Sequence, residues 1–391
     1  MSSSNDDEMM IREAVRRFIE RDVKPDVQQI EASDEFPQRL VDGMANLGLF
    51  GVVVPAEYGG FPVSLSTYAA IMEELSAGWT SLPSFMNSHC SVASIISKYG
   101  TEEQRRRYLP RLADGSMRGA IMLSEPGAGS DLQAIRTTAT LQKDGSYRLS
   151  GSKVFITNGS RASLFLALAK TDPKAEPRKD GISLVILEKG TPGFSVVRLF
   201  SKMAFKHVDT AELLLQNAPV AADQIVGGIP GRGFSQLMSV LETGRIAMAA
   251  TANGLARAAL EASLRYANER EAFGVSIGQH QAVQALLANM ATKLAASRAL
   301  TAEAAKIKDQ GGRADMISGM AKMFASESCM EITGDAMKVH GGYGYVEDFP
   351  VERMYREAPL YVLTEGTNEI QRSIIARRLL NGDELASLGI F

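Results

Sequence analysis

The sequence contains few cysteines. Only two occur in 391 residues, Cys90 and Cys329, and they lie in unrelated contexts. They form no CxxC motif and no metal-ligand spacing, so we predict no metal site. Such sparse cysteine usage fits a reducing compartment.

Excess positive charge and long apolar runs are also lacking. The chain has 42 Lys and Arg against 45 Asp and Glu, a formal net charge of −3. Nucleic-acid-binding proteins normally show a clear basic excess. No run of about 18 apolar residues is present to span a membrane. The start, MSSSNDDEMM, resembles neither a secretory signal nor an Arg-rich transit peptide. We therefore expect a cytoplasmic protein with no nucleic-acid partner and no membrane partner.

What is present indicates a globular chain of several domains. Its length exceeds one typical core, and its 45% apolar and 22% charged composition excludes disorder. Residues 1–119 predict an N-terminal helical domain, because apolar residues between 11 and 19 follow helical spacing. Further helices are expected at 66–77 and 102–113.

The pattern then changes twice. Residues 120–230 predict a middle β domain of barrel or sandwich type, with short apolar or alternating runs at 146–151, 164–168, 182–187 and 211–216. Residues 231–391 predict a C-terminal antiparallel helix bundle, with Ala-rich stretches at 246–263 and 282–306 and a break at 311–315. The predicted fold class is therefore α+β.

One loop near the C-terminus presents a candidate base. Glu365 precedes Gly366, and Thr367 is a good N-cap for a helix whose first turn holds Glu369. A glutamate on a glycine-hinged loop beside a helix start can abstract a proton. Taken alone, a solvated loop glutamate is the better interpretation.

Two segments of the β region could line a ligand. In the first, 121–131, glycines allow close backbone approach and Ser124 and Ser130 offer hydroxyls. No GxGxxG or GxxxxGK[ST] motif accompanies it, so neither a Rossmann site nor a P-loop is supported. In the second, 151–159, Phe155 stands two residues before Thr157, where it could line a flat cofactor or simply belong to the core.

Three segments of the helical region carry similar ambiguity. Glu242 and Arg245 share a helix face, either to bind a polar ligand or to form a solvated ion pair. Arg270 could bind a phosphate and Gln281 a base or ribose. The glycine-dense segment 340–350 could bring backbone N–H groups to a phosphate.

In this order, the segments closely resemble the acyl-CoA dehydrogenase family of flavoenzymes, from about residue 10 to residue 380. The resemblance implies the three-domain architecture, with FAD between the β domain and the bundle, and assigns Glu365 as the catalytic base. It implies that the FAD contacts are Leu123, Ser124, Gly129, Ser130, Phe155, Ile156, Thr157, Arg270, Phe273, His280, Gln281, Lys338, Gly341, Gly342, Thr367 and Glu369. It implies that the acyl-CoA contacts are Ser130, Glu242, Arg245, Thr364, Gly366 and Arg377.

The chemistry that the resemblance implies is α,β-dehydrogenation of an acyl-CoA to the trans-2-enoyl-CoA. Glu365 removes the α-proton while flavin N5 accepts the β-hydride. The backbone N–H of the base and a ribityl hydroxyl bind the thioester oxygen, and such donors are each worth about 3–4 kcal/mol. Expulsion of water by substrate makes the carboxylate a stronger base. Electrons leave to an electron-transfer flavoprotein, and the family norm is a homotetramer, a dimer of dimers, in which Arg270 and Gln281 reach a neighbour's FAD.

Departures from the family pattern concern the acyl group. Some members carry the base on the long helix just before the arginine that matches Arg245, but Gly244 stands there in this chain. Thr364 replaces a common tyrosine and Phe155 a common tryptophan, while Lys338 and Pro359 are also atypical. The smaller Thr364 and Phe155 predict a branched, cyclic or bulky acyl group. His89 could meet a polar acyl tail or be a core histidine.

Two other readings stay open. One is another reaction on the same scaffold, such as an acyl-CoA oxidase, a nitroalkane oxidase with aspartate as base, or a desulfinase without the base. The other is a non-catalytic acyl-CoA-binding homologue.

Overall fold

The computed structural model describes residues 5–33 and 35–381, and the chain forms two compact units from alternating segments. Among the described residues, the first unit comprises 5–7, 35–63 and 84–241, and the second comprises 8–33, 64–83 and 242–381. The two units do not test the three domains predicted from the sequence, so the domain boundaries at residues 119 and 230 stay predictions.

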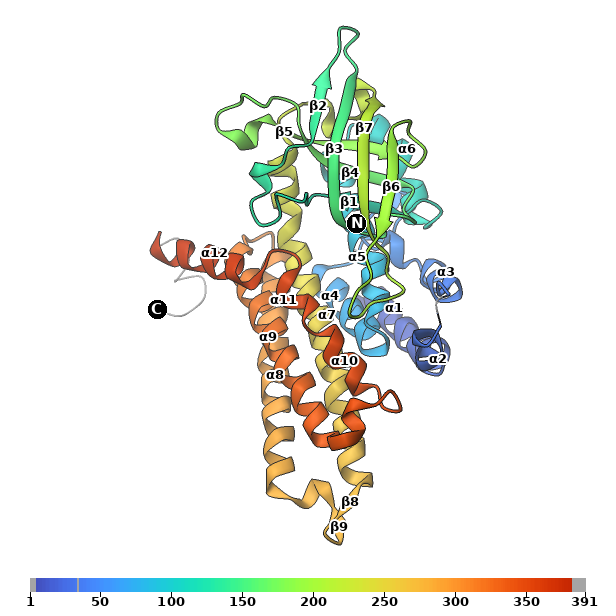
Figure 1. Ribbon diagram of the computed structural model, residues 1–391, viewed down its shortest axis with the longest axis vertical. Helices are drawn as coiled ribbons and strands as arrows, with labels where there is room; N and C mark the ends of the chain where they lie inside the picture. The colour runs from blue at the N-terminus through green and yellow to red at the C-terminus, as the bar shows by residue number, and fades with distance from the viewer. Residues whose placement is uncertain (1–4, 34, 382–391) are drawn as a thin grey trace. The chain divides into compact units, whose positions relative to one another are not determined.

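The first unit is built on a seven-stranded sheet (Figure 1). Its strands are β1 (Gly119–Met122), β2 (Thr138–Leu141), β3 (Tyr147–Thr157), β4 (Leu164–Lys170), β5 (Ile182–Glu188), β6 (Phe194–Leu199) and β7 (Thr210–Val220). They follow the order β1-β4-β2-β3-β7-β6, and β5 pairs with β4. The longest pairing is the antiparallel one between β3 and β7.

Helices and short 3-10 turns complete this unit. They are α3 (Gln38–Asn46), η2 (Leu49–Gly51), η3 (Ala56–Tyr58), most of α5 (Ser81–Tyr99), α6 (Glu102–Ala113), η4 (Leu132–Ala134), η5 (Arg178–Gly181), η6 (Ala222–Gln224), η7 (Val226–Gly228) and the start of α7 (Gly233–Glu269). Helix α6 begins with a capping box, in which Thr101 and Gln104 satisfy each other's backbone N–H groups.

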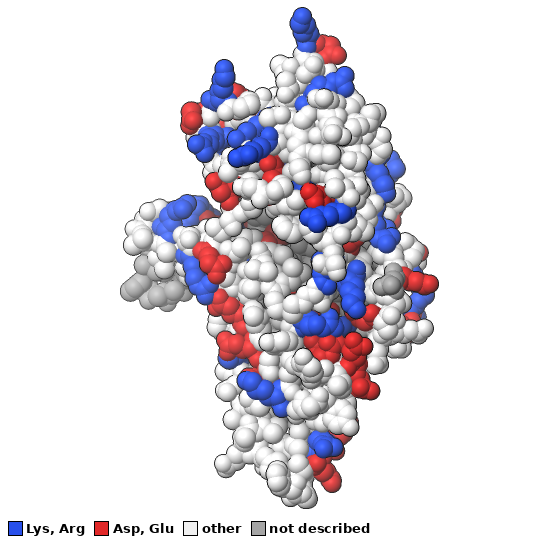
Figure 2. Space-filling view, viewed as in Figure 1, with Lys and Arg blue, Asp and Glu red and all other residues white. Residues whose placement is uncertain are grey.

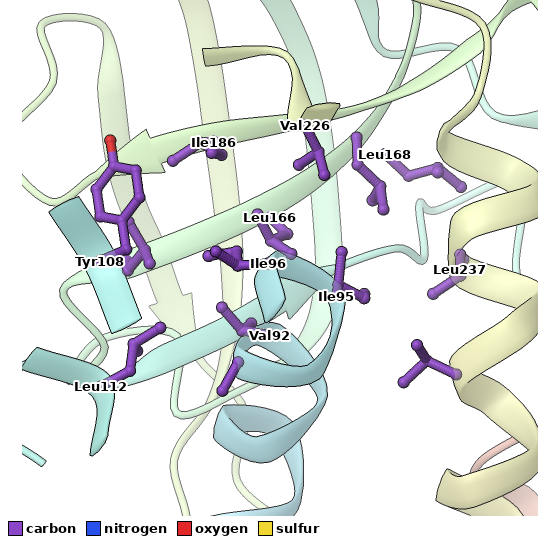
Figure 3. Packing of buried hydrophobic residues seen from close by; sticks show 14 of the residues in the cluster. Val92, Ile95, Ile96, Tyr108, Leu112, Leu166, Leu168, Ile186, Val226 and Leu237 are labelled. Carbon is purple, nitrogen blue, oxygen red and sulfur yellow. The ribbon is translucent and has the colours of Figure 1, made fainter. Parts of the chain in front are cut away.

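Strand β4 is buried on both faces, which explains its unbroken apolar sequence. Leu164, Leu166 and Leu168 pack against residues of α5 and α6, as Figure 3 shows for part of the cluster. The alternating residues Phe165 and Ala167 belong to a second core, built with residues of β3 and β7. Because side chains alternate along a strand, such a strand needs apolar residues at every position.

The predicted strand runs are confirmed: three fall within β4, β5 and β7, and the run 146–151 overlaps the start of β3. Sequence reasoning missed β1, β2 and β6. The first two are only four residues long, and β6 pairs with β7 alone and is largely exposed. A short or edge strand buries too few side chains to impose a clear apolar pattern.

The second unit is helical. Its elements are α1 (Asn5–Phe18), the π-helix η1 (Ile19–Val23), α2 (Val27–Glu31), α4 (Leu65–Gly78), most of α7, the hairpin β8 (Glu271–Ala272) and β9 (Val275–Ser276), η8 (Ile277–Gln279), α8 (Gln281–Asp309), α9 (Asp315–His340), η9 (Gly341–Tyr345), α10 (Val351–Glu357), α11 (Leu360–Leu363) and α12 (Asn368–Leu380). The helices expected at 66–77 and 102–113, and over both Ala-rich stretches, are confirmed. Helices α8 and α9 lie antiparallel, side by side (Figure 1), and the predicted break separates them at Gly311, where φ is +77°.

The surface charge, the helices and the metal-binding side chains were each predicted to lack a special feature. On the face shown in Figure 2, basic and acidic side chains are interspersed. No helix in the described part of the chain is both long enough and apolar enough to cross a membrane. Within residues 5–33 and 35–381, no three His, Cys, Asp or Glu side chains are grouped to hold a metal ion.

Candidate active site

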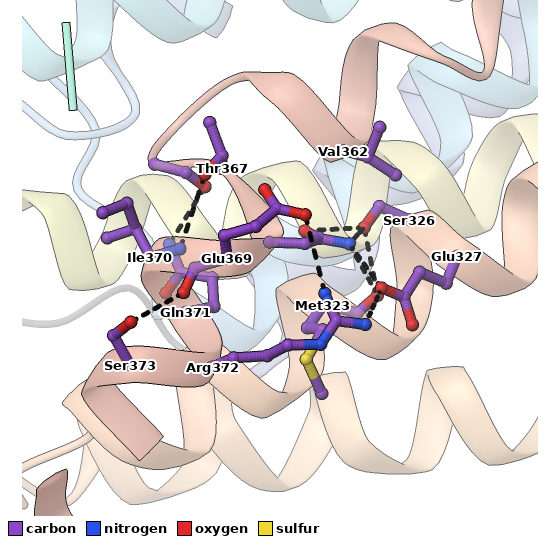
Figure 4. Close-up of polar contacts among 12 residues, drawn as sticks. Met323, Ser326, Glu327, Val362, Thr367, Glu369, Ile370, Gln371, Arg372 and Ser373 are labelled. Atoms are coloured by element: carbon purple, nitrogen blue, oxygen red, sulfur yellow. Dashed lines mark hydrogen bonds and ion pairs between the residues drawn. The ribbon is translucent and has the colours of Figure 1, made fainter. Parts of the chain in front are cut away.

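The predicted base lies in a backbone turn that few side chains tolerate. Glu365 has φ of +55° and Gly366 has φ of +82°, both in the left-handed region. For a non-glycine residue this conformation costs roughly 1–3 kcal/mol and persists only where surrounding contacts enforce it. The chain then enters α12, whose N-cap Thr367 accepts a hydrogen bond from the N–H of Ile370 at 3.4 Å (Figure 4). The predicted loop-to-helix transition is confirmed.

Two buried side chains hold the backbone of this turn. Gln371 Nε2 donates to the carbonyl oxygens of Glu365, at 3.2 Å, and Gly366, at 3.0 Å. Lys322 Nζ donates to the carbonyl oxygens of Gly366, at 3.0 Å, and Val362, at 3.4 Å. Lys322 and Gln371 are fully buried, so water cannot take the place of these backbone carbonyls as their hydrogen-bond acceptors.

Lys322 also anchors the first turn of α12. Its Nζ donates to Asn368 Oδ1 at 2.9 Å, and Asn368 Nδ2 donates to Ser326 Oγ at 3.0 Å and Glu327 Oε1 at 3.1 Å. Figure 4 shows Ser326 and Glu327 of α9 beside the start of α12. Burial lowers the pKa of Lys322 to about 8, against the attraction of Glu365. A charged lysine therefore lies beneath the turn at neutral pH.

The carboxylate of Glu365 packs against a glycine of the long helix α7. A Cβ placed on Gly244 would lie 2.7 Å from Glu365 Oε2, closer than real Cβ contacts, and 3.2 Å from its Cδ, tighter than most of them. The glycine at the alternative base position therefore leaves the space in which the Glu365 carboxylate lies.

The neighbouring Arg245 is buried, with 7% of its surface exposed. Burial lowers its pKa, while Glu365, Glu242 and Asp315 raise it. Its Nε has no hydrogen-bond partner among the described residues. Glu242 instead accepts a hydrogen bond from Lys308 Nζ at 2.6 Å. The alternative of a solvated pair between Glu242 and Arg245 is therefore wrong.

Thr364 precedes the base at the end of α11. Its Oγ1 donates either to the Leu360 carbonyl at 3.2 Å or to Met248 Sδ at 3.7 Å. Thr364 is partly buried, as is Met248 on α7. The hydroxyl thus has partners within this unit.

In the first unit, a buried ion pair holds the glycine-rich segment 121–131. Lys153 Nζ donates to Glu125 Oε1 at 2.8 Å and to the carbonyls of Leu123 and Leu168. Glu125 also accepts backbone N–H groups of the segment after it, at Arg136 and Thr137. Burial lowers the pKa of Lys153 to about 8 despite Glu125.

This segment lies beside the second predicted flavin segment. The N–H of Val154 donates to the carbonyl of Ser124 at 2.9 Å. Gly129 and Ser130 are exposed, and a Cβ on Gly129 would meet nothing within 4 Å. The structure therefore brings the predicted residues of 121–131 and 151–159 together with open space above the glycine.

Phe155 lies outside the core. Its φ is +59°, the pairing of β3 with β7 shifts register there, and 66% of its surface is exposed. A β-bulge reverses the direction of a side chain in this way. The adjacent Ile156 is buried in the second core. The core interpretation of Phe155 is therefore wrong, while Ile156 can offer a ligand only its backbone.

The remaining predicted FAD contacts form two groups in the second unit. Around the β8–β9 hairpin, Arg270 lies just before β8, Phe273 lies in the turn, and His280 and Gln281 follow β9. The φ of Phe273 is +54° and its side chain is 96% exposed. His280 shares a hydrogen bond with the Ala272 carbonyl at 3.2 Å. Lys338, Gly341 and Gly342 lie at the end of α9, and Lys338 pairs with Asp335 at 2.8 Å. Arg377 is exposed on α12.

His89 is a satisfied core histidine. It is fully buried, with Nε2 3.1 Å from the Phe50 carbonyl and Nδ1 3.2 Å from the Gly119 N–H. These partners fit a neutral ring with the proton on Nε2. Burial lowers its pKa to about 4. The alternative of a core histidine is confirmed.

Known proteins match this chain along most of its length. Three family models match the chain: the acyl-CoA dehydrogenase N-terminal domain over residues 5–116, middle domain over 120–218 and C-terminal domain over 231–380. An acyl-CoA dehydrogenase of Bacillus subtilis (strain 168) is 40% identical over 377 residues, which cover 96% of this chain and 98% of that protein.

Solved structures are similar over the same length. The butyryl-CoA dehydrogenase of Megasphaera elsdenii has a TM-score of 0.92 and 34% identity, covering 97% of this chain and 100% of that one. A chain from a structural study of the electron transferring flavoprotein of Acidaminococcus fermentans has a TM-score of 0.90 and 39% identity, covering 97% and 99%. This chain belongs to the acyl-CoA dehydrogenase family.

Proposed function

We propose that this protein removes the α- and β-hydrogens of an acyl-CoA thioester, with Glu365 as the base for the α-proton. The observation that carries this proposal is the enforced conformation of the base turn. Lys322 and Gln371 fix the carbonyls of Glu365 and Gly366, and Gly244 leaves room for the carboxylate. A carboxylate held in one position is more effective than a mobile one because orientation is established before reaction.

The proton is accepted by a carboxylate oxygen of Glu365. Its backbone N–H is proposed to donate to the thioester oxygen, where negative charge develops. The ammonium of Lys322 binds the carbonyl of Gly366 at 3.0 Å and so holds the residue that follows the base. Arg245, buried with an unpartnered Nε, is proposed to bind a polar part of the acyl-CoA.

Members of the family are FAD-dependent, and FAD, when bound, accepts the β-hydrogen as a hydride. The residues present fit such a group: Phe155 is exposed at a bulge, and a Cβ on Gly129, Gly341 or Gly342 would meet open space. The proposed contacts are those implied by the resemblance: Leu123, Ser124, Gly129, Ser130, Phe155, Ile156, Thr157, Arg270, Phe273, His280, Gln281, Lys338, Gly341, Gly342, Thr367 and Glu369.

The oligomeric state and the electron acceptor are part of the proposal. We propose the homotetramer that is the norm of the family, in which Phe273, 96% exposed on the single chain, contacts a neighbouring subunit. Sedimentation of the FAD-loaded protein tests this, since an active, FAD-bound monomer would contradict it. Similarity to a chain from an electron transferring flavoprotein study supports an electron-transfer flavoprotein as acceptor.

The acyl group is proposed to be branched, cyclic or bulky, because Thr364 and Phe155 are smaller than the aromatic residues common in the family. Turnover of 2-methyl-branched and alicyclic thioesters should exceed that of butyryl- and octanoyl-CoA. The reverse order would refute this part of the proposal without affecting the role of Glu365.

The decisive experiment is anaerobic bleaching of the flavin by a panel of acyl-CoA thioesters. We expect bleaching by the native protein, and a rate lowered by several orders of magnitude with unchanged FAD content in Glu365→Gln. Glu57→Gln, at an exposed residue of η3, is the control and should behave as the native protein. Near-normal bleaching of Glu365→Gln would eliminate the assignment. Rapid peroxide formation in air would instead indicate an acyl-CoA oxidase, and a protein that never bleaches would indicate a non-catalytic homologue.

A further inference from the structure

The first unit contains a partly open cavity of about 400 Å³ that includes none of the residues assigned above to FAD or acyl-CoA. The residues around it come from α3, η2, the α6–β1 connection and the ends of β4 and β5: Gln38, Val41, Asp42, Ala45, Phe50, Gly115, Ser116, Arg118, Arg161, Ser163 and Lys189. Its volume lies within the range of small-molecule sites, about 300–1,000 Å³.

Two arginines of this cavity share one aromatic ring. The guanidinium carbon of Arg161 lies 3.9 Å from the centre of the Phe36 ring, and that of Arg118 lies 5.8 Å from it. Such contacts occupy the flat face of a guanidinium and leave its N–H edge available. Phe36 therefore holds two arginines close together with donors still to be satisfied.

The cations outnumber the carboxylates around the cavity. Burial lowers the pKa of Arg118, and repulsion by Arg161 lowers it further, while Asp42 and Asp209 oppose the shift. The Arg118 side chain makes no hydrogen bond and no ion pair with any residue in the described ranges. A guanidinium without a protein acceptor, beside a second guanidinium, offers charged N–H donors to an anion.

The nearby carboxylates are already engaged. Asp42 Oδ1 accepts a hydrogen bond from Gln38 Nε2 at 2.6 Å. Asp209 lies outside the lining and accepts the N–H of Ser160 at 2.7 Å, with Arg161 Nε 3.9 Å away. Three cations of the lining, counting Lys189, thus face the single carboxylate of Asp42.

A hydroxyl and an ammonium add further donors to the cavity lining. Ser163 Oγ accepts the N–H of Arg118 at 3.2 Å, which leaves its O–H to donate into the cavity. Lys189 Nζ donates to the Ser160 carbonyl at 2.8 Å and retains two further N–H donors. Edge-on guanidiniums, an ammonium and a hydroxyl are the donors that bind a phosphate dianion.

We propose that this cavity binds the phosphate group of a small organic molecule, with Arg118 and Arg161 as its principal ligands. The volume exceeds what inorganic phosphate needs, so an organic part occupies the remainder beside Phe50 and Val41. A free phosphate monoester and the 3′-phosphate of a CoA thioester share this chemistry and are distinguished by the test.

The test is isothermal titration calorimetry on the FAD-loaded protein with glycerol 3-phosphate, glycerol, CoA and 3′-dephospho-CoA as probes. Native protein should bind glycerol 3-phosphate and not glycerol, with affinity falling as salt rises. Arg118→Gln/Arg161→Gln should weaken that binding at least tenfold. Arg118→Lys/Arg161→Lys should weaken it by less, because the positive charges remain and only the guanidinium N–H donors beside Phe36 are lost. Lys143→Gln/Arg148→Gln, on the exposed β2–β3 hairpin, removes the same charge and should change nothing.

If the arginine double variant also abolishes the preference for CoA over 3′-dephospho-CoA, the phosphate belongs to the CoA. If only glycerol 3-phosphate binding is lost, the ligand is a separate metabolite. Circular dichroism and FAD content show whether Arg118→Gln/Arg161→Gln folds. If it does not fold, the loss of binding is measured with Arg118→Lys/Arg161→Lys instead. Equal affinity of the native protein and both arginine variants, or no binding of either phosphate probe by the native protein, overturns the proposal.

Discussion

The carboxylate of Glu365 occupies the space that a side chain at position 244 would need. A Cβ on Gly244 would stand 2.7 Å from Glu365 Oε2. Gly244 is buried inside α7, so the helix cannot move aside without disturbing its packing. The absence of a side chain on one helix therefore determines where the proposed base can lie.

Gly244→Ala should lower turnover by about 10²-fold, because a displacement of about 1 Å at a reacting group has that effect. Stability should not fall in parallel, since alanine favours a helix interior by roughly 1 kcal/mol over glycine. Steady-state kinetics and urea unfolding measure the two effects. Gly334→Ala in α9 is the control, because a Cβ there meets only Tyr355 at 3.8 Å. Equal turnover in both variants would show that the Gly244 contact does not position Glu365.

Lys322→Met should lower kcat by about 10–100-fold with a smaller change in KM, because the turn loses the donor that binds two of its carbonyls. The acid limb of the pH–rate profile should also move to higher pH, since a positive charge near Glu365 is removed.

A purely structural role of Lys322 would reduce the amount of folded protein and leave the pH profile of the remainder unchanged. Lys322→Arg should recover part of kcat and restore the position of the acid limb, because the charge returns. Lys306→Met, at an exposed lysine of α8, is the comparison and should leave both parameters as in the native protein.

Glu125→Gln should destabilise the first unit by about 3–5 kcal/mol, because it leaves Lys153 buried with its charge uncompensated. Glu125→Met/Lys153→Met should lose less, since neither charge remains in the core. Urea unfolding of the three proteins measures the difference. A double variant less stable than Glu125→Gln would show that the ion pair itself supplies the stability.

Glu357 should make stability fall as pH rises. Burial raises its pKa from 4.5 to about 8, with Arg353 opposing, and neither carboxylate oxygen has a hydrogen-bond partner in the described part of the chain. Between about pH 4.5 and 8 the folded state retains a proton that the unfolded state releases, so this residue alone lowers stability by up to about 1.4 kcal/mol per pH unit.

Glu357→Gln removes that contribution, so the difference in unfolding free energy between variant and native protein should grow in the variant's favour from pH 5 to 8. Above about pH 8 the difference should become constant. Urea midpoints at several pH values give the slope, with Glu103→Gln, an exposed residue of α6, as control. A difference independent of pH would mean that Glu357 is ionised when folded.

Periodicity predicted the elements that bury most side chains. The apolar run of β4 could be interpreted because both faces are buried, and the N-cap at Thr367 is a local signal. Glu365 was a candidate because a glycine and a helix start follow it, and only the family resemblance assigned it as the base. The β-bulge at Phe155 could not be found, since register depends on the partner strand β7.

The residues that hold the site were missed for a common reason. Lys322, Gln371 and Lys153 look like ordinary surface residues, because lysine and glutamine are rarely fully buried. Their burial follows from tertiary neighbours far along the chain, which one sequence does not reveal. A lysine flanked by small and apolar residues on α9 was the one available hint, and it is weak.

The alternation of segments between the two units has a consequence for synthesis on the ribosome. Segments 8–33 and 64–83 emerge early but belong to a unit whose remaining residues begin at 242. Tyr68, Ile71 and Leu75 of α4 are buried in the finished protein and must wait for partners made much later. Domains generally fold in order of synthesis, but here the early helices of the second unit are made well before residues 242 onward, with which they form that unit.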